Sequence, residues 1–190
     1  MEPKMMKQMT TSLCLMLIAA AALAQGGELD LPGLKKQLAH PDYAVRKAAV
    51  DVFLAAGRAR PLKKQEIGLL LPPLKSDSDW RIKVRITAVL PFAADKAQVL
   101  PPLMAALRER GDEDSGGGNL QIYSCEALAR IGDPKALPAM REWLAFLNAN
   151  PKEFKLLKED LIEHTRQRIK KLEDKTKERG SNKPDARDGL

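Results

Sequence analysis

The apolar positions between residues 31 and 147 repeat a helical spacing, and one stretch of it returns in recognisable form. HPDYAVRKAAVDVF begins at His40, and DSDWRIKVRITAVLPF begins at Asp77, roughly 40 residues further on. A third copy, LQIYSCEALARIGD, begins at Leu120. Aligned, the copies place small or aliphatic side chains in the same columns: Ala49 with Ala88, Val50 with Val89 and Cys125, and Phe53 with Phe92 and Leu128.

A proline-containing segment accompanies each copy and predicts a second helix for it. Proline suits the first turn of a helix, where its missing N–H would have no intrahelical partner. We therefore expect helices to begin at these segments, which are LPGL at 31–34, LPPL at 71–74, LPPL at 100–103 and LPAM at 137–140. The turn-forming residues HPD and SDSD separate the first two segments from the copies that follow them. The pattern predicts paired helices and an all-α fold.

These features resemble HEAT-like repeats, in particular the bacterial variety also found in phycobilisome lyases. The resemblance is carried by PDYAVRKAAV at 41–50, KVRITAV at 83–89 and EALARIGDPKALPAM at 126–140. It implies a short right-handed α-solenoid of about three to four helical hairpins within residues 25–150, closed by a capping helix. The family serves mainly as protein-binding scaffolds, with scattered enzymes and DNA binders.

The copies also differ from one another. Gln121 stands where the other copies carry Arg46 and Arg85, Pro91 interrupts the second copy late in its helix, and residues 58–65 lengthen the first link between repeats. Arginine at this position of the family pairs with aspartates in turns. The resemblance therefore implies that Arg46 and Arg85 tie adjacent repeats together, with Asp42 and Asp79 as available partners.

The N-terminal residues indicate export. Lys4 and Lys7 precede the apolar run LCLMLIAAAALA at 13–24, which ends in the small-x-small pattern of a signal cleavage site. We expect a signal peptide over residues 1–24 and a mature chain beginning at Gln25, either periplasmic or extracellular and not integral to the membrane. Cys14 would leave with the signal, so Cys125 would have no partner for an intramolecular disulfide.

The C-terminal part divides in two. Residues 151–180 carry an apolar stripe among alternating charges, which predicts an amphipathic helix that covers the end of the repeats. Residues 181–190 lack apolar content, and we expect them to be disordered.

Few residues suggest catalysis or a metal site. His40 and His164 fall in separate elements without neighbouring ligands, and Cys125 occupies a column of small core residues. The stretch GDEDSGGGN lacks both the closing glutamate of a calcium loop, since Tyr123 stands there, and the ending of a phosphate-binding loop. It is interpreted as a flexible connection, or alternatively as a partner-binding tip at 112–119. We expect no enzyme activity and no cofactor.

Two hypotheses of function follow. The first is a noncatalytic scaffold that binds another protein through non-core positions of the second helices and through a turn tryptophan. Its candidate contacts are Lys47, Asp51, Trp80, Ile86, Leu90 and Glu126. The second uses the formal charge of +7 and is an electrostatic binder of an anionic polymer or nucleic acid. Its candidate contacts are Arg58, Arg60, Lys63, Lys64, Arg81 and Lys83.

Trp80 fits either hypothesis. An aromatic side chain among cations can stack on a base or a sugar, or it can cap the end of a hydrophobic core. The signal peptide directs the chain away from chromosomal DNA, so nucleic acid is an unlikely partner, and neither the identity of a protein partner nor the oligomeric state follows from the sequence.

Overall fold

The computed structural model describes residues 28–109, 119–150 and 158–181, and the regular elements within these ranges are helices, with no β-strand among them. This confirms the all-α expectation. The predicted signal peptide, the glycine-rich stretch 110–118, residues 151–157 of the predicted C-terminal helix and residues 182–190 of the predicted tail lie outside the described residues, whereas Ser181, predicted to belong to the tail, is the last residue of a helix. In chain order the elements are α2 (Leu31–Leu38), α3 (Tyr43–Ala59), α4 (Lys64–Ser76), α5 (Trp80–Val89), the 3-10 turn η1 (Leu90–Phe92), α6 (Lys96–Arg108), α7 (Asn119–Ile131), the 3-10 turn η3 (Pro134–Ala136), α8 (Leu137–Ala149) and α9 (Lys158–Ser181).

Aspartate side chains set where several of these helices begin. A side-chain oxygen at the N-cap accepts a hydrogen bond from a backbone N–H of the first turn, which would otherwise lack a partner. The four capping aspartates and the N–H groups that they accept from are Asp30 with Gly33, Asp42 with Ala44, Asp79 with Arg81, and Asp95 with Ala97. The turns HPD and SDSD therefore act as helix starts as well as chain reversals.

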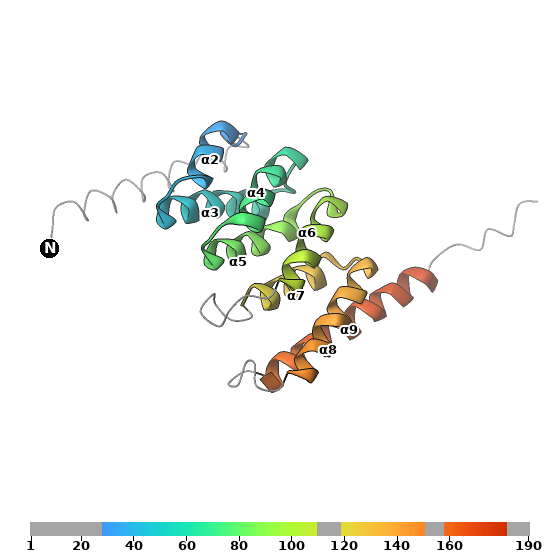
Figure 1. Cartoon of the computed structure of the whole chain (residues 1–190). Helices are drawn as coiled ribbons and strands as arrows, with labels where there is room; N and C mark the ends of the chain where they lie inside the picture. The colour runs from blue at the N-terminus through green and yellow to red at the C-terminus, as the bar shows by residue number, and fades with distance from the viewer. Residues whose placement is uncertain (1–27, 110–118, 151–157, 182–190) are drawn as a thin grey trace, which may run out of the picture.

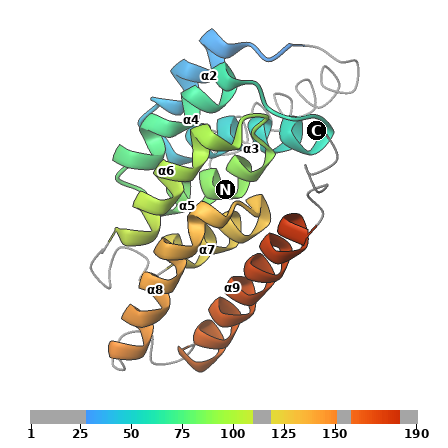
Figure 2. The same ribbon diagram turned by 90° about the vertical axis from the view of Figure 1, so that its right-hand side faces the viewer.

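The helices form two layers. The even-numbered helices contact one another in the order α2, α4, α6, α8, and the odd-numbered helices do so in the order α3, α5, α7, α9. Each even-numbered helix also contacts the odd-numbered helix that follows it in the chain. Figures 1 and 2 show this progression from α2 at one end of the molecule to α8 and α9 at the other.

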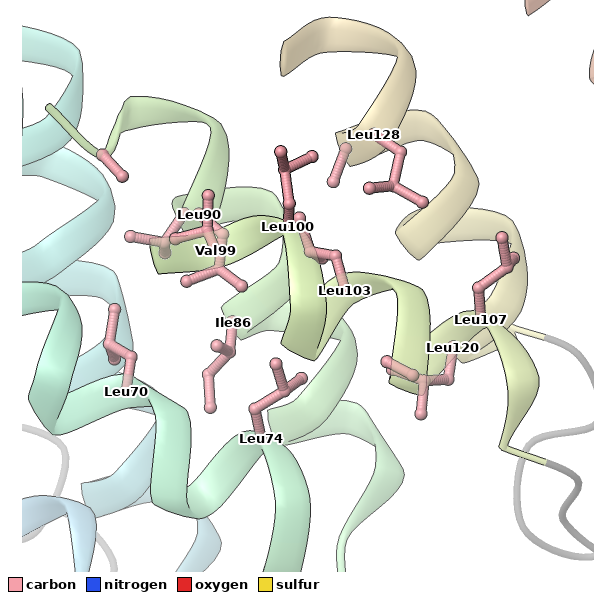
Figure 3. Packing of buried hydrophobic residues seen from close by; sticks show 14 of the residues in the cluster. Leu70, Leu74, Ile86, Leu90, Val99, Leu100, Leu103, Leu107, Leu120 and Leu128 are labelled. Atoms are coloured by element: carbon pink, nitrogen blue, oxygen red, sulfur yellow. The ribbon is translucent and has the colours of Figure 1, made fainter. Parts of the chain in front are cut away.

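A single hydrophobic cluster lies between the layers and includes residues from α2 through α9. Figure 3 shows its middle, where Leu70 and Leu74 of α4 face Ile86 of α5, and Leu103 of α6 lies between them and Leu128 of α7. These side chains are at most 3 % exposed. Each large apolar side chain that is removed from water in this way stabilises the fold by about 1.5–3 kcal/mol.

Two of the four proline-containing segments do not start helices. The expectation holds for Pro32 and Pro138, which occupy the first turns of α2 and α8. It is wrong for the pairs at 72–73 and 101–102, because α4 begins about two turns and α6 about one turn before the predicted starts, and these prolines lie inside the helices. Proline inside a helix removes a hydrogen bond to the carbonyl four residues before it. Pro72 and Pro101 are exposed, so the carbonyls that lose a partner lie on the solvent side, where their cost is smallest.

The link between α3 and α4 is shorter than predicted. Arg58 belongs to the last turn of α3, and only residues 60–63 separate the two helices. Leu62 within this link is fully buried and forms an isolated bridge with Ala93, through Leu62 N–H to Phe92 O at 2.8 Å and Ala94 N–H to Leu62 O at 2.9 Å. The link therefore fastens the first repeat to the end of the second.

α5 ends at Val89, and Pro91 lies in the turn η1 that follows, as the interruption of the second copy at this proline indicates. Lys96 secures this turn, because its ammonium group donates to the carbonyl oxygens of Pro91 and Ala93, both at 2.6 Å. Burial lowers the pKa of Lys96 from its ordinary value.

The C-terminal helix α9 covers the far end of the stack. It packs against both α8 and α7, and Leu161, Ile169 and Leu172 are its buried apolar residues. No helix within the described ranges is long and apolar enough to cross a membrane.

Candidate functional site

Three of the predicted partner-binding residues take part in ion pairs along the odd-numbered helices. Asp51 of α3 accepts hydrogen bonds from Lys47, at 2.8 Å, and from Arg85 of α5. Glu126 of α7 accepts from Arg168 of α9. These side chains are half-buried, and we call the surface that they form on α3, α5, α7 and α9 the odd-helix surface. Its prominent charges are largely neutralised within the molecule.

Two other predicted contact residues lie in the core. Ile86 and Leu90 are both 0 % exposed, so their placement among the non-core positions is wrong. Ile86 occupies the column of Lys47 in the repeat alignment, but α5 is packed between α3 and α7, whereas α3 has a neighbour of its own layer on one side only. Because α5 is covered on both sides, Ile86 and Leu90 are aliphatic where the first copy has polar residues.

Trp80 is half-buried at the start of α5. The aromatic contact nearby involves its neighbour instead, because the Arg81 guanidinium lies 4.2 Å from the centre of the Tyr43 ring. Tyr43 begins α3 and packs partly on the core. The contact joins the starts of two consecutive odd-numbered helices.

Four of the six predicted anion-binding cations are engaged with carboxylates. The pairs are Arg60 with Glu66 at 2.8 Å, Lys63 with Glu28 at 2.7 Å, Arg81 with Asp79 at 2.7 Å, and Lys83 with Glu109 at 2.6 Å. Lys83 is also buried, which removes it from any surface that a polymer could reach. Arg58 and Lys64 are exposed and form no ion pair within the described ranges.

The ion pair between Arg60 and Glu66 lies at the N-terminus of α4. Burial on its own would raise the pKa of Glu66, but hydrogen bonds from the Arg60 guanidinium and the Lys63 N–H hold it below its ordinary value. The same carboxylate thus neutralises a predicted anion-binding arginine and caps a helix.

The two repeated arginines do tie adjacent repeats together, but with partners other than those predicted. Arg46 binds Asp77 in the turn before α5, at 2.9 Å, rather than Asp42. Arg85 binds Asp51 of the preceding odd-numbered helix, rather than Asp79. Asp42 and Asp79 are committed to helix caps, which explains the exchange of partners.

A groove of about 600 Å³ opens above the Arg46 and Asp77 pair, between the end of α2 and the second half of α4. The sequence analysis did not identify it. The residues that line it are Lys35, Leu38, Ala39, His40, Arg46, Gly68, Leu69, Pro72, Pro73, Ser76, Asp77 and Ser78. The signal that could have found it is Gly68, four residues before Pro72, because a glycine removes side-chain bulk from the surface of the helix that carries it.

Cys125 is a core residue, as its column in the repeats predicts. It is 2 % exposed, and burial raises the pKa of its thiol to about 11. A thiol of this kind is protonated at neutral pH and therefore a poor nucleophile. Within the described ranges no cluster of three or more His, Cys, Asp or Glu side chains could hold a metal ion.

Comparisons of the chain with protein-family models, with curated proteins and with solved structures give no match.

Proposed function

We propose that this chain is a noncatalytic, exported scaffold that binds another protein in the cell envelope or outside the cell. In this proposal the two layers of helices are a short right-handed α-solenoid of three to four HEAT-like hairpins closed by α9. Stacked repeats of this kind present extended surfaces on which partners bind.

The observation that carries the proposal is the groove beside α2 and α4. It is an open surface feature with polar groups that are not all matched within the described part of the chain, whereas the cations that favoured an anionic polymer are mostly bound to carboxylates. A groove of a few hundred cubic ångströms between two helices suits a short segment of another protein.

Affinity capture tests the proposal. The chain from Gln25, carrying a tag, is incubated with an envelope extract and washed at low and then at moderate salt, and the retained material is identified by mass spectrometry. We expect one protein at near-equal stoichiometry after both washes. Acidic polymer that is lost at moderate salt, with no retained protein, would contradict the scaffold and favour the electrostatic binder, because phosphate contacts weaken steeply with salt.

A further inference from the structure

The groove between α2 and α4 has walls of different character. One wall is the last turn of α2 with Lys35, Leu38 and the following His40, and the other is α4 with Gly68 and its proline pair. Its volume of about 600 Å³ lies in the range that protein pockets use for small ligands and short peptide segments.

The wall formed by α4 offers unmatched backbone acceptors. Pro72 and Pro73 have no N–H, so the carbonyls of Gly68 and Leu69 receive no hydrogen bond from the residue four positions later. Both of these residues line the groove. Gly68 is exposed and adds no side chain to this wall, and a Cβ built there would meet no atom within 4 Å. Hydrogen-bond donors of a ligand can therefore reach this wall.

The floor of the groove is the Arg46 and Asp77 pair, whose charges neutralise each other. Arg46 donates to Asp77 and also to the carbonyl oxygens of His40 and Pro41, and Asp77 additionally accepts from the Asp79 N–H. The side chains of this pair are only 12 % and 6 % exposed. The floor is thus a satisfied, neutral base, and recognition has to come from the walls.

The wall formed by α2 supplies positive charge and a donor. Lys35 is exposed and forms no ion pair within the part of the chain that the structure describes. His40 accepts the Asp42 N–H at its Nδ1, at 3.0 Å, which leaves the proton of the neutral ring on Nε2. Lys35 and His40 can therefore both donate to a carboxylate.

We infer that this groove binds an extended peptide segment of the partner protein that carries an acidic side chain. The backbone N–H groups of the peptide donate to the carbonyls of Gly68 and Leu69, its carboxylate accepts from Lys35 and His40, and a neighbouring apolar side chain packs on Leu38 and the prolines. The inference rests on the proposed scaffold function and names its binding surface and the class of its ligand.

A peptide fits this groove better than a polyanion does. A run of phosphates carries acceptors and no N–H donors, so it offers nothing to the two carbonyls that Pro72 and Pro73 leave without a donor four residues later. An extended peptide brings backbone N–H donors for these carbonyls as well as a carboxylate for Lys35 and His40. A basic peptide would bring donors too, but its charge would be repelled by Lys35.

Gly68→Leu provides the decisive test, because it fills the groove from a position where the fold has room. The full chain and the variant are each used to select from a displayed library of short random peptides, and the enriched peptides are titrated against both proteins by fluorescence anisotropy. We expect the full chain to enrich peptides rich in Asp and Glu and the variant to bind them at least about tenfold more weakly. Equal binding to both proteins, or enrichment of basic peptides, overturns the inference.

Charge reversal gives a second test with a matched control. Lys35→Glu is expected to weaken binding of the selected peptides about threefold to tenfold, while Lys36→Glu, the same change one position along α2 and outside the groove lining, leaves it nearly unchanged. Equal losses in the two variants would show a general charge effect and overturn the specific role of Lys35. An N-methylated version of the same peptide, which lacks backbone donors, should bind as weakly as the parent peptide binds Gly68→Leu.

Affinity capture with the same variants separates this inference from the proposed function. If Gly68→Leu still retains the protein that the unchanged chain retains, the scaffold stands and the groove is the wrong surface. If the unchanged chain retains no protein, the scaffold function itself fails.

Discussion

The odd-helix surface and the groove beside α2 and α4 differ in how their polar groups are used. On the odd-helix surface, conspicuous charges such as Asp51 and Glu126 find partners on the next helix of the same layer. In the groove, two of the polar groups are backbone carbonyls, those of Gly68 and Leu69. They receive no hydrogen bond from four residues later, because Pro72 and Pro73 have no N–H. These charged side chains thus hold neighbouring helices together, and the groove that we propose for binding lies where prolines interrupt the hydrogen bonds of a helix.

Arg46→Ala should have the largest effect, because it removes the floor of the groove and leaves Asp77 as a nearly buried charge without its partner. Breaking one side of a buried ion pair costs about 3–5 kcal/mol, and we expect a loss of unfolding free energy near the lower end of that range. Urea denaturation followed by circular dichroism measures it.

Arg81→Ala is the comparison for this variant, since its side chain is 54 % exposed and its carboxylate partner lies two residues away. Little or no change in the unfolding free energy is expected there, because water screens an exposed ion pair. Equal losses of unfolding free energy in Arg46→Ala and Arg81→Ala would mean that the Arg46 and Asp77 pair stabilises the fold no more than an exposed ion pair does.

The pKa of the Cys125 thiol measures how well the odd-numbered helices shield the core from water. The native thiol keeps its proton up to a pKa of about 11, whereas an unperturbed thiol releases it near 9.0. Between these two pH values the unfolded chain loses a proton that the folded chain retains, so the unfolding free energy falls with rising pH, by about 2–3 kcal/mol from this group.

The contribution of Cys125 is isolated by comparison with Cys125→Val, which carries the residue of the equivalent columns in the other two copies. The difference in stability between the two proteins should be constant below pH 9 and change steadily above it. A difference that stays constant up to pH 11 would place the thiol in contact with water.

Two glycines distinguish the packed and the open parts of the fold. A Cβ on Gly57 in α3 would lie 2.8 Å from Cβ of Phe92, whereas a Cβ on Gly68 in α4 would meet nothing. We expect Gly57→Ala to destabilise the protein by about 1–3 kcal/mol, because overpacking outweighs the gain in helix propensity. Thermal unfolding by calorimetry measures the loss.

Gly68→Ala should have the smallest effect on stability, and it should stabilise the protein. Alanine is favoured over glycine inside a helix by about 0.8–1 kcal/mol, and no clash opposes that gain here. The same calorimetric scan should show a higher midpoint than that of the unchanged chain. A lower midpoint would mean that the groove is closed in solution.

Much of the fold was predictable because local patterns decide it. The repeated stretches are helices, their aspartates are caps, and Pro91 ends α5 where the alignment suggests. The helix starts at 71 and 100 were mispredicted because a proline pair inside a helix and one at its beginning look alike in sequence. What separates them is an upstream cap: Asp95 caps α6, and Glu66 accepts a hydrogen bond from the Lys63 N–H at the start of α4.

The surfaces were harder to predict, because they depend on which residues the layers bring together. Asp42 and Asp79 looked like the available partners for the repeated arginines, and only the packing of α3 against the turn before α5 shows that Arg46 binds Asp77 instead. The groove depends on the absence of side-chain bulk at Gly68 and on missing N–H groups. A search for charged or nucleophilic residues does not detect such features.

The ion pairs between repeats join residues that lie between 26 and 42 positions apart in the chain, and each helix packs chiefly on its predecessors and successors in the two layers. No contact of this kind requires the two ends of the chain to meet. Contacts of short sequence separation favour rapid folding. The described residues can therefore acquire their structure in the order in which they emerge from a ribosome, with each completed pair of helices serving as the template for the next.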